Sequence, residues 1–326
     1  MRFLLLGYNP YLSLILTALA KTDFLTDNDI DVVMAIPPQK DKTTFVLDQV
    51  KSTNSPDQVT HLSKEIAVAQ RTSNQHFPEI DSAFLDHYPN VQLRPYPGLN
   101  HLAKLNTYDY MIVASYAKKI PRAIFDQPKY GTLNIHPSLL PNLRGGYPTY
   151  IQAFDPSAMR GTTIHVMSDE WDDGHIVAQQ VDPDITPLTN EALLLLSAKQ
   201  AAELLNQLHR TKFQIDAIHQ DVSQVTYCHK VLKRHHFLET MSTASDFVGH
   251  VRANYDRHLF PHVFTLFENE LFIILAVEPV VLDAASYQSI KNKAIFIIED
   301  RFYVLFDNQV FQITQGIFRG KYLKVG

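Results

Sequence analysis

Short apolar runs alternate with amphipathic stretches through the first half of the sequence, and this alternation restricts the fold more than any other feature. The runs Arg2–Leu6, Ile30–Ile36, Tyr110–Ser115 and Thr132–Ile135 have the length of strands rather than of buried helices. Strands that alternate with helices pair in parallel, and helices then cover both faces of the sheet. We therefore expect an α/β domain with a largely parallel sheet. The polar region 39–75 carries few strand signals, and its fold is left open.

A long amphipathic helix is predicted after Pro187. Thr189 can cap its first turn, because a threonine hydroxyl accepts hydrogen bonds from the free N–H groups there. The apolar residues of one helix face recur at helical spacing: Leu194, Ala198, Ala201, Leu205 and Leu208. We expect this helix to close a first domain of residues 1–209. A linker is predicted from Phe213 to Ser223, where the pattern weakens.

Beyond residue 210 the sequence changes to short apolar runs joined by tight polar turns. These runs are His262–Phe267, Leu271–Val277, Ala294–Ile298, Phe302–Phe306 and Val310–Thr314. Runs of this length and spacing are typical of antiparallel sheets. We predict a small barrel or sandwich as a second domain of residues 210–326.

Neither cysteine content nor charge points to an exported or nucleic-acid-binding protein. Cys228 is the only cysteine, so the chain forms no internal disulfide. The N-terminal apolar stretch resembles a signal peptide, but Gly7-Tyr8-Asn9-Pro10 interrupts it with turn residues. A strand, a turn and a helix from about Tyr11 fit better, and a cytoplasmic location is expected. The net charge of −5 provides no broad basic surface for a polyanion.

The stretch NIHPSLLPNLRGG concentrates polar chemistry at the end of a predicted strand. Asn134 and His136 are two residues apart, so their side chains point to the same face. Ligands of open α/β sheets generally bind at the carboxyl ends of the strands. Pro137 stops the strand pairing, and Gly145-Gly146 turns the following chain into a loop that can surround a substrate.

A second polar segment lies between the predicted strands Thr162–Val166 and Ile176–Ala178. It holds four carboxylates within five positions: Asp169, Glu170, Asp172 and Asp173. Such crowding raises the pKa of at least one carboxyl group unless a cation or a histidine compensates. A solvated acidic turn and a strand histidine that only packs are the alternatives for these residues. No pair of Cys and His residues has the spacing of a zinc site.

The two segments together resemble the 10-formyltetrahydrofolate-dependent formyltransferases, which act on glycinamide ribonucleotide, methionyl-tRNA or amino sugars. Asn134, His136 and the run Ser138–Pro141 match the family pattern N-x-H-x-S-L-L-P, and Asp172–Gly174 supplies its later D-x-G. The resemblance implies a Rossmann-like formyltransferase catalytic domain followed by a smaller β-rich domain with an OB-like barrel. It also implies 10-formyltetrahydrofolate as the co-substrate, with no metal.

The same resemblance implies catalytic roles for Asn134, His136 and Asp172. Asn134 and a protonated His136 would donate hydrogen bonds to the oxyanion that develops on the formyl oxygen. Asp172 would favour the charged form of His136 and take the proton of the attacking amine. The pterin would bind the backbone of two loops, formed by Ala117, Lys118, Lys119 and Ile120, and by Met167, Ser168 and Asp169. Lys118-Lys119 and the loop at Gly7–Pro10 depart from the family pattern.

The amine that accepts the formyl group is the open question. Methionyl-tRNA formyltransferases carry a basic insertion, whereas the corresponding segment here offers only Lys40 and Lys42. A nucleotide-linked amino sugar is therefore preferred, with tRNA as the alternative. Arg144, Tyr147 and Tyr150 are candidates for binding it, and a homodimer is possible. A formyltetrahydrofolate hydrolase or a folate-binding scaffold would explain the motifs without transfer to an amine.

Overall fold

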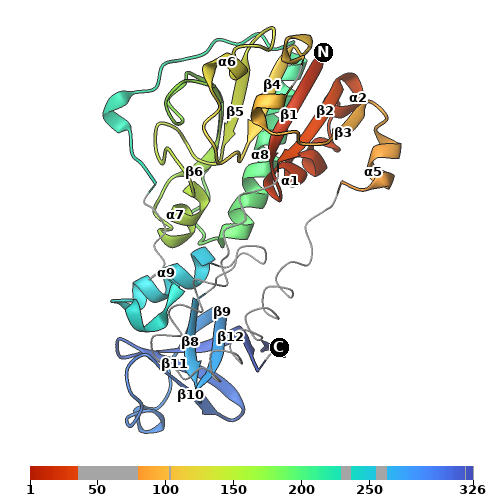
Figure 1. Cartoon of the computed structure of the whole chain (residues 1–326). Helices are drawn as coiled ribbons and strands as arrows, with labels where there is room; N and C mark the ends of the chain where they lie inside the picture. Colours follow the sequence, from red (N-terminus) through yellow and green to blue (C-terminus); the bar gives the residue numbers. More distant parts are fainter. Residues whose placement is uncertain (36–79, 103, 229–235, 255–262, 320, 326) are drawn as a thin grey trace.

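The computed structural model describes residues 1–35, 80–102, 104–228, 236–254, 263–319 and 321–325. Two sheets organise these residues, one in the N-terminal and one in the C-terminal part of the chain (Figure 1). Part of the sequence predictions falls outside the described residues. This applies to the polar region 39–75, with Lys40 and Lys42, and to the strand ends Ile36 and His262.

The N-terminal sheet has the strand order β3-β2-β1-β4-β5-β6-β7. Its strands are β1 (Arg2–Tyr8), β2 (Asp29–Ala35), β3 (Val91–Arg94), β4 (Tyr110–Ala114), β5 (Thr132–His136), β6 (Arg160–Val166) and β7 (Ile176–Asp182). The five strands from β3 to β5 pair in parallel, and β6 and β7 are antiparallel. The predicted Rossmann-like sheet is therefore confirmed, with β3 as an addition that the sequence did not indicate.

Both faces of this sheet are covered, as continuous apolar strands require. Phe3 and Leu5 of β1 belong to a core with α1 (Tyr11–Leu19), α2 (Phe24–Asp27) and α8 (Asn190–Arg210). Leu4 and Leu6 face the opposite way, toward η2 (Leu105–Thr107) and α6 (Arg122–Phe125). The remaining short helices of this part are α5 (Ser82–His87), η1 (Leu99–His101) and α7 (Pro148–Phe154). The alternation along β1 shows the period of two that a strand buried on both faces produces.

The helix predicted after Pro187 is α8. The Thr189 side chain accepts a hydrogen bond from the backbone N–H of Ala192 and caps the helix, as expected. Four of the five predicted face residues are buried, and Leu194 packs against the same core. This helix lies across the sheet beside α1 (Figure 1).

The segment predicted as a linker is instead an arm that packs on the N-terminal part. Phe213 is buried in the core beside Phe3, and Ile218 pairs with Ile176 at the start of β7. The arm continues through η3 (Val222–Gln224) to Cys228, whose N–H donates to the carbonyl of Arg144. The linker prediction was wrong because polar residues that make specific tertiary contacts leave no periodic pattern in a sequence. The domain boundary between residues 209 and 210 stays a prediction.

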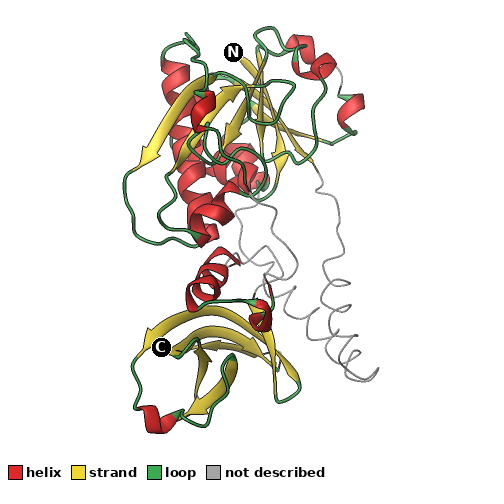
Figure 2. Cartoon of the chain, turned by 90° about the vertical axis from the view of Figure 1, so that its left-hand side faces the viewer, coloured by secondary structure: helices red, strands yellow, loops and turns green. Residues whose placement is uncertain are grey.

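The C-terminal sheet is antiparallel and curled into a half-barrel (Figure 2). Its strands are β8 (Val263–Phe267), β9 (Glu270–Val280), β10 (Ala294–Ile298), β11 (Arg301–Phe306), β12 (Gln309–Phe318) and β13 (Lys321–Lys324), with η5 (Leu238–Thr240) and η6 (Ala284–Ser286) as short helices. The helix α9 (Ala244–Asn254) packs Phe247 and Val251 into its core. The β-rich character of this part is thus confirmed, whereas α9 was not predicted.

The two parts meet where α7 and α9 lie side by side (Figure 1). The hydroxyl of Tyr150 on α7 lies 2.8 Å from Nδ1 of His250 on α9. The Arg252 guanidinium donates to the carbonyls of Ala153 and Phe154, which end α7. These contacts use the unpaired carbonyl groups at a helix end, and they join the C-terminal part to the segment that follows the NIHPSLLP motif.

Candidate active site

The site is built at the carboxyl end of β5, where the sheet changes from parallel to antiparallel pairing. Asn134 on β5 stands directly opposite His165 on β6 in the strand register. His136, two residues after Asn134, ends the strand on the same face. Cross-strand neighbours of this kind have side chains close enough to interact. The sheet therefore brings an amide and two imidazoles together before any loop contributes.

The acidic loop between β6 and β7 supplies Asp172. The backbone of Asp172 adopts φ 53°, in the left-handed region that costs free energy for residues other than glycine. At Gly174 a Cβ atom would collide with the carbonyl oxygen of Val166, so only glycine allows the loop to pass so close to β6. The D-x-G pattern thus has a steric reason as well as a chemical one.

Four polar side chains converge at this point. Oδ1 of Asp172 lies 3.6 Å from Nδ1 of His136, 3.5 Å from Nε2 of His165 and 3.3 Å from Nδ2 of Asn134. The other carboxylate oxygen accepts a 2.8 Å hydrogen bond from the N–H of Gly145. Asp172 is only 8% exposed. The structure therefore places the three predicted catalytic residues in one cluster, in which His136 and Asp172 are buried and Asn134 is half-buried.

Burial dominates the electrostatics of His136. It lowers the pKa of the imidazole below its ordinary value, although the Asp172 carboxylate and the Leu143 carbonyl act in the opposite direction. The balance is opposite to the sequence-based expectation that Asp172 would keep His136 charged. Burial alone would raise the pKa of Asp172, but the charge that His136 carries when it is protonated, the contacts with His165 and the Gly145 N–H together hold it at about 2. The cluster at rest therefore pairs a carboxylate with a neutral imidazole.

Hydrogen bonds to backbone carbonyls assign the tautomers of both histidines. Nε2 of His136 lies 2.8 Å from the carbonyl oxygen of Leu143, so this nitrogen carries the proton and Nδ1 has a free lone pair. Nδ1 of His165 donates to the carbonyl of Val166, and its Nε2 accepts from Asn134 Nδ2 at 3.0 Å. His165 thereby fixes the orientation of the Asn134 amide. His165 was not among the predicted site residues, although its place on the alternating strand Thr162–Val166 was the available signal.

Each of the four crowded carboxylates has a partner. Asp169 accepts two hydrogen bonds from Arg122, and Glu170 lies 3.9 Å from Lys119. Asp173 forms a 2.6 Å ion pair with Arg144, and Asp172 faces the histidines. Cations and histidines thus compensate the four carboxylates, as is needed if crowding is not to raise their pKa values. These pairs hold the acidic loop against the neighbouring loops.

The two loops predicted to bind the pterin lie next to each other. The first, Ala117–Ile120, follows β4, and the second, Met167–Asp169, follows β6. Met167 packs against the apolar cluster that contains Ile120, and the Arg122–Asp169 pair joins the loops at the surface. Ala117, Lys118 and Lys119 are exposed. The structure thus brings these residues together, and their role in binding stays a prediction.

The three residues predicted to bind the acceptor lie in different surroundings. The Arg144 guanidinium is buried and contacts Gln220 and Asp173. Tyr150 is buried at the contact with α9, whereas Tyr147 is 57% exposed. Two further aromatic side chains of these segments are exposed and were not among the predicted residues: Trp171, which precedes Asp172, and Tyr227, whose backbone pairs with Arg144. Of the three predicted residues, Tyr147 alone has a side chain open to a ligand.

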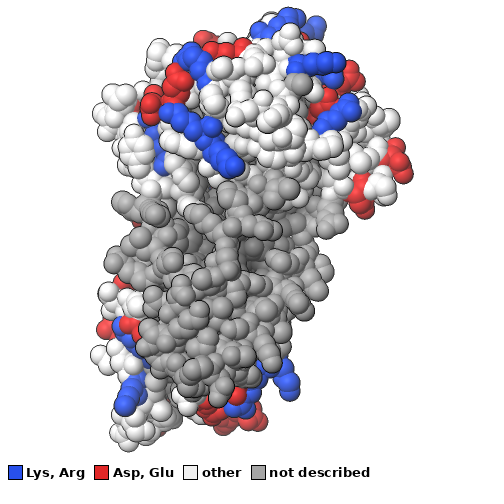
Figure 3. Space-filling view, viewed as in Figure 1, with Lys and Arg blue, Asp and Glu red and all other residues white. Residues whose placement is uncertain are grey.

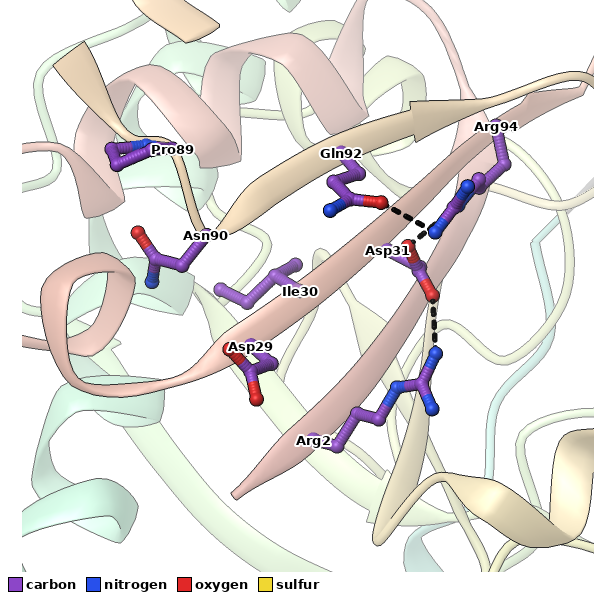
Figure 4. A pocket seen from close by; sticks show the side chains of 8 residues that line it. All are labelled: Arg2, Asp29, Ile30, Asp31, Pro89, Asn90, Gln92 and Arg94. Atoms are coloured by element: carbon purple, nitrogen blue, oxygen red, sulfur yellow. Dashed lines mark hydrogen bonds and ion pairs between the residues drawn. The ribbon is translucent and has the colours of Figure 1, made fainter. Parts of the chain in front are cut away.

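A separate cavity of about 510 Å³ lies at the opposite end of the sheet, at the starts of β1 and β2 (Figure 4). Asp31, which lines it, accepts hydrogen bonds from Arg2 and Arg94 of the same lining and from Tyr108. Burial would raise the pKa of Asp31, but these three donors outweigh it and lower the pKa. This cavity is stabilised by its own ion pairs and lies far from the carboxyl ends where the polar cluster is found.

The fold and the cluster define an α/β protein with polar side chains gathered at the carboxyl ends of its strands, where such folds generally bind ligands. The chain belongs to the formyl transferase family, because the family model described as "Formyl transferase" matches residues 3–207. It is 29% identical over 168 residues to a methionyl-tRNA formyltransferase of Geobacillus sp. (strain WCH70), covering 50% of this chain and 51% of that protein. A methionyl-tRNA formyltransferase of Ehrlichia chaffeensis is 30% identical over 171 residues, with coverages of 51% and 53%. The chain thus spans about half the length of these relatives.

Solved structures resemble nearly the whole chain. One is an N-formyltransferase from Helicobacter canadensis in complex with folinic acid and dTDP-3-aminofucose, with a TM-score of 0.55, 12% identity and coverages of 95% and 98%. Another is HypX from Aquifex aeolicus in complex with tetrahydrofolic acid, with a TM-score of 0.56, 13% identity and coverages of 98% and 44%. At these identities the likeness establishes the fold and no more.

Two further properties concern the described residues alone. No cluster of three or more His, Cys, Asp or Glu side chains among them is arranged to hold a metal ion. Within the same ranges, no helix combines the length and the apolar character that a membrane crossing requires.

Proposed function

We propose that this protein transfers the formyl group of 10-formyltetrahydrofolate to a primary amine. The observation that carries the proposal is the convergence of Asn134, His136 and Asp172 in one cluster, inside the segment that matches the formyl transferase family. An amine nucleophile needs a proton acceptor, and the developing oxyanion needs hydrogen-bond donors. The cluster holds both kinds of group within a few ångströms.

His136 is the proton acceptor in this proposal. Its Nδ1 lone pair is free, because Nε2–H donates to the Leu143 carbonyl. Burial keeps the pKa of the ring low, so the imidazole is neutral when the amine arrives. As the amine nitrogen bonds to the formyl carbon, its proton passes to Nδ1, and Asp172 at 3.6 Å stabilises the new positive charge. The protonated ring then donates toward the formyl oxygen or returns the proton to the departing nitrogen of tetrahydrofolate.

Asn134 is the second donor to the oxyanion. Its amide donates to His165 at 3.0 Å and to Asp172 at 3.3 Å. The bond to Asp172 is the longer of the two, so it is the one that yields to a negatively charged formyl oxygen. His165 keeps the amide turned with its nitrogen toward the reacting centre. Donors of this kind contribute about 3 to 4 kcal/mol each to the transition state.

For the acceptor we propose a nucleotide-linked amino sugar. Tyr147, Trp171 and Tyr227 lie on segments that carry or contact the cluster and expose aromatic rings, and such rings stack on a nucleobase. On the face shown in Figure 3, basic and acidic side chains of the described residues are intermixed rather than gathered into a basic surface. A tRNA acceptor depends on many phosphate contacts. The methionyl-tRNA formyltransferases among the sequence relatives keep tRNA as the second candidate.

The test measures tetrahydrofolate release from 10-formyltetrahydrofolate with a panel of nucleotide amino sugars and, separately, with methionyl-tRNA. Trp171 is the single tryptophan, so its fluorescence also reports binding of the folate without turnover. A rate several-fold above the rate without amine identifies the acceptor class. The matched variants are Asp172→Asn, which should lose turnover, and Asp216→Asn, an exposed carboxylate that should keep it. Equal release with and without amine, accompanied by formate, would show a hydrolase, and binding without turnover would show a scaffold.

A further inference from the structure

The arm of residues 211–228 returns to the active-site loops after α8, beyond the segment 3–207 that matches the family. It forms an isolated antiparallel bridge between Ile218 and Ile176, just after the acidic loop. Further along, the Thr226 hydroxyl accepts from the N–H of Leu143, and the Thr226 N–H donates to the carbonyl of Pro141. The arm thus contacts both loops that surround the catalytic cluster.

Gln220 stands at the centre of these contacts and is 9% exposed. Its Nε2 donates to the carbonyl of Asp172 at 2.8 Å and to the carbonyl of Gly174 at 2.7 Å. Its Oε1 accepts from Nε and Nη2 of Arg144 at 3.1 and 2.7 Å. The third nitrogen of Arg144 holds Asp173. Both hydrogens and both lone pairs of the Gln220 amide are therefore used, which fixes its orientation.

The hydrogen bonds of Gln220 stabilise an unfavourable backbone conformation in the acidic loop. Asp172 has a left-handed backbone, which aspartate adopts only when its surroundings hold it there. The Gly145 N–H holds its carboxylate, and Gln220 holds its carbonyl. Without the second bond, rotation of the peptide would carry the carboxylate away from Nδ1 of His136.

We propose that Gln220 is a positioning residue of the active site, which holds the backbone of Asp172–Gly174 so that the Asp172 carboxylate faces His136 and Asn134. This inference rests on the proposed function of the cluster. Gln220 touches no reacting atom and acts through Asp172. A segment outside the matched family region thereby becomes part of the catalytic apparatus.

The experiment compares Gln220→Glu, Gln220→Met and the control Gln214→Glu, a change at an exposed glutamine of the same arm. Glutamate at 220 keeps an acceptor for Arg144 but loses the donors to the two carbonyls, and methionine has neither. We expect kcat to fall by about 100-fold in both variants, the order of loss caused by misplacing a catalytic group by about 1 Å. KM for 10-formyltetrahydrofolate should stay within about twofold, because the folate loops are untouched, and the control should match the wild type. Thermal unfolding confirms that each variant is folded.

A second measurement does not depend on turnover. The pKa of His136 is followed by NMR of the imidazole in the wild type and in Gln220→Met, with His136→Asn to assign the signal. We expect the pKa of His136 to fall in Gln220→Met, because the carboxylate has moved away from Nδ1. An unchanged pKa, or an unchanged kcat in a wild type that transfers formyl groups, would overturn the positioning role and leave the proposed function intact. If the wild type shows no turnover but the pKa of His136 still falls in Gln220→Met, the proposed function is contradicted and the positioning role of Gln220 is not.

Discussion

Replacement of Asp172 by asparagine should make the free energy of unfolding less dependent on pH, by an amount that follows from the pKa of Asp172. The pKa of Asp172 lies at about 2 in the folded protein, against its ordinary value of 3.8. A pKa below the unfolded value means that the ionised carboxylate stabilises the fold. This difference in pKa corresponds to about 2 kcal/mol of unfolding free energy. The contribution is fully present above about pH 4 and is lost as the pH falls toward 2.

Hydrogen bonds hold the ionised carboxylate. Its two oxygens accept from the N–H of Gly145 at 2.8 Å and from the Asn134 amide at 3.3 Å. Hydrogen bonds to the charged form of a group favour that form. Asparagine is nearly isosteric, keeps an oxygen for the Gly145 N–H and tolerates a left-handed backbone. The substitution therefore removes the charge, and with its oxygen turned to Gly145 the asparagine also lacks the acceptor for the Asn134 amide.

The assay is urea denaturation of the wild type, Asp172→Asn and the control Asp216→Asn between pH 7 and pH 3. Fluorescence of Trp171, the residue next to Asp172, reports unfolding at the loop itself. The Asp172→Asn penalty should be about 2 kcal/mol at pH 7 and about 1 kcal/mol at pH 3. A penalty that is absent at pH 7, or of equal size at both pH values, would refute the electrostatic reasoning.

Three further predictions follow from the same geometry. Asn134→Asp should lower kcat by about 100-fold, because a donor is lost and a second carboxylate stands 3.3 Å from Asp172. A wild-type rate of the chemical step in single-turnover kinetics would contradict this prediction. Gly174→Ala should destabilise the protein by about 2 to 3 kcal/mol, because its Cβ meets the Val166 carbonyl, and thermal melts that match the wild type would exclude the clash. Tyr150→Phe should cost about 1 kcal/mol through the lost hydrogen bond to α9 while leaving KM for the acceptor unchanged, so a raised KM would instead support the predicted role in acceptor binding.

Hydrophobic patterns in the sequence predicted the strands whose burial produces such a pattern. The strands β1, β2, β4 and β5 are buried on both faces and therefore read as continuous apolar runs. In contrast, β3 exposes three of its four residues, and β13 is similarly open to solvent, so neither carries a hydrophobic signature. The sequence motifs placed Asn134, His136 and Asp172 correctly within one cluster.

The rest of the site depends on tertiary register, which a sequence does not display. His165 matters because strand pairing sets it opposite Asn134. Arg144 has the residue type of an anion ligand, yet its partners lie within the protein: Asp173 and Gln220, which is 76 positions away in the chain. Gln220 itself lies in a polar stretch without periodicity, which was interpreted as a linker. The lowered pKa of His136 likewise follows from burial that no single segment reveals.

The return of the arm to the catalytic loops sets a rule for engineering chimaeras in this family. A crossover placed at residue 209, after the long helix, would exchange Gln220 and Thr226 together with the foreign barrel. The second parent protein would then have to provide groups that replace the hydrogen bonds of Gln220 and Thr226 to the loops of the first parent. A crossover after Cys228 keeps both sides of these contacts in one parent, so the C-terminal sheet can be exchanged without disturbing the polar cluster.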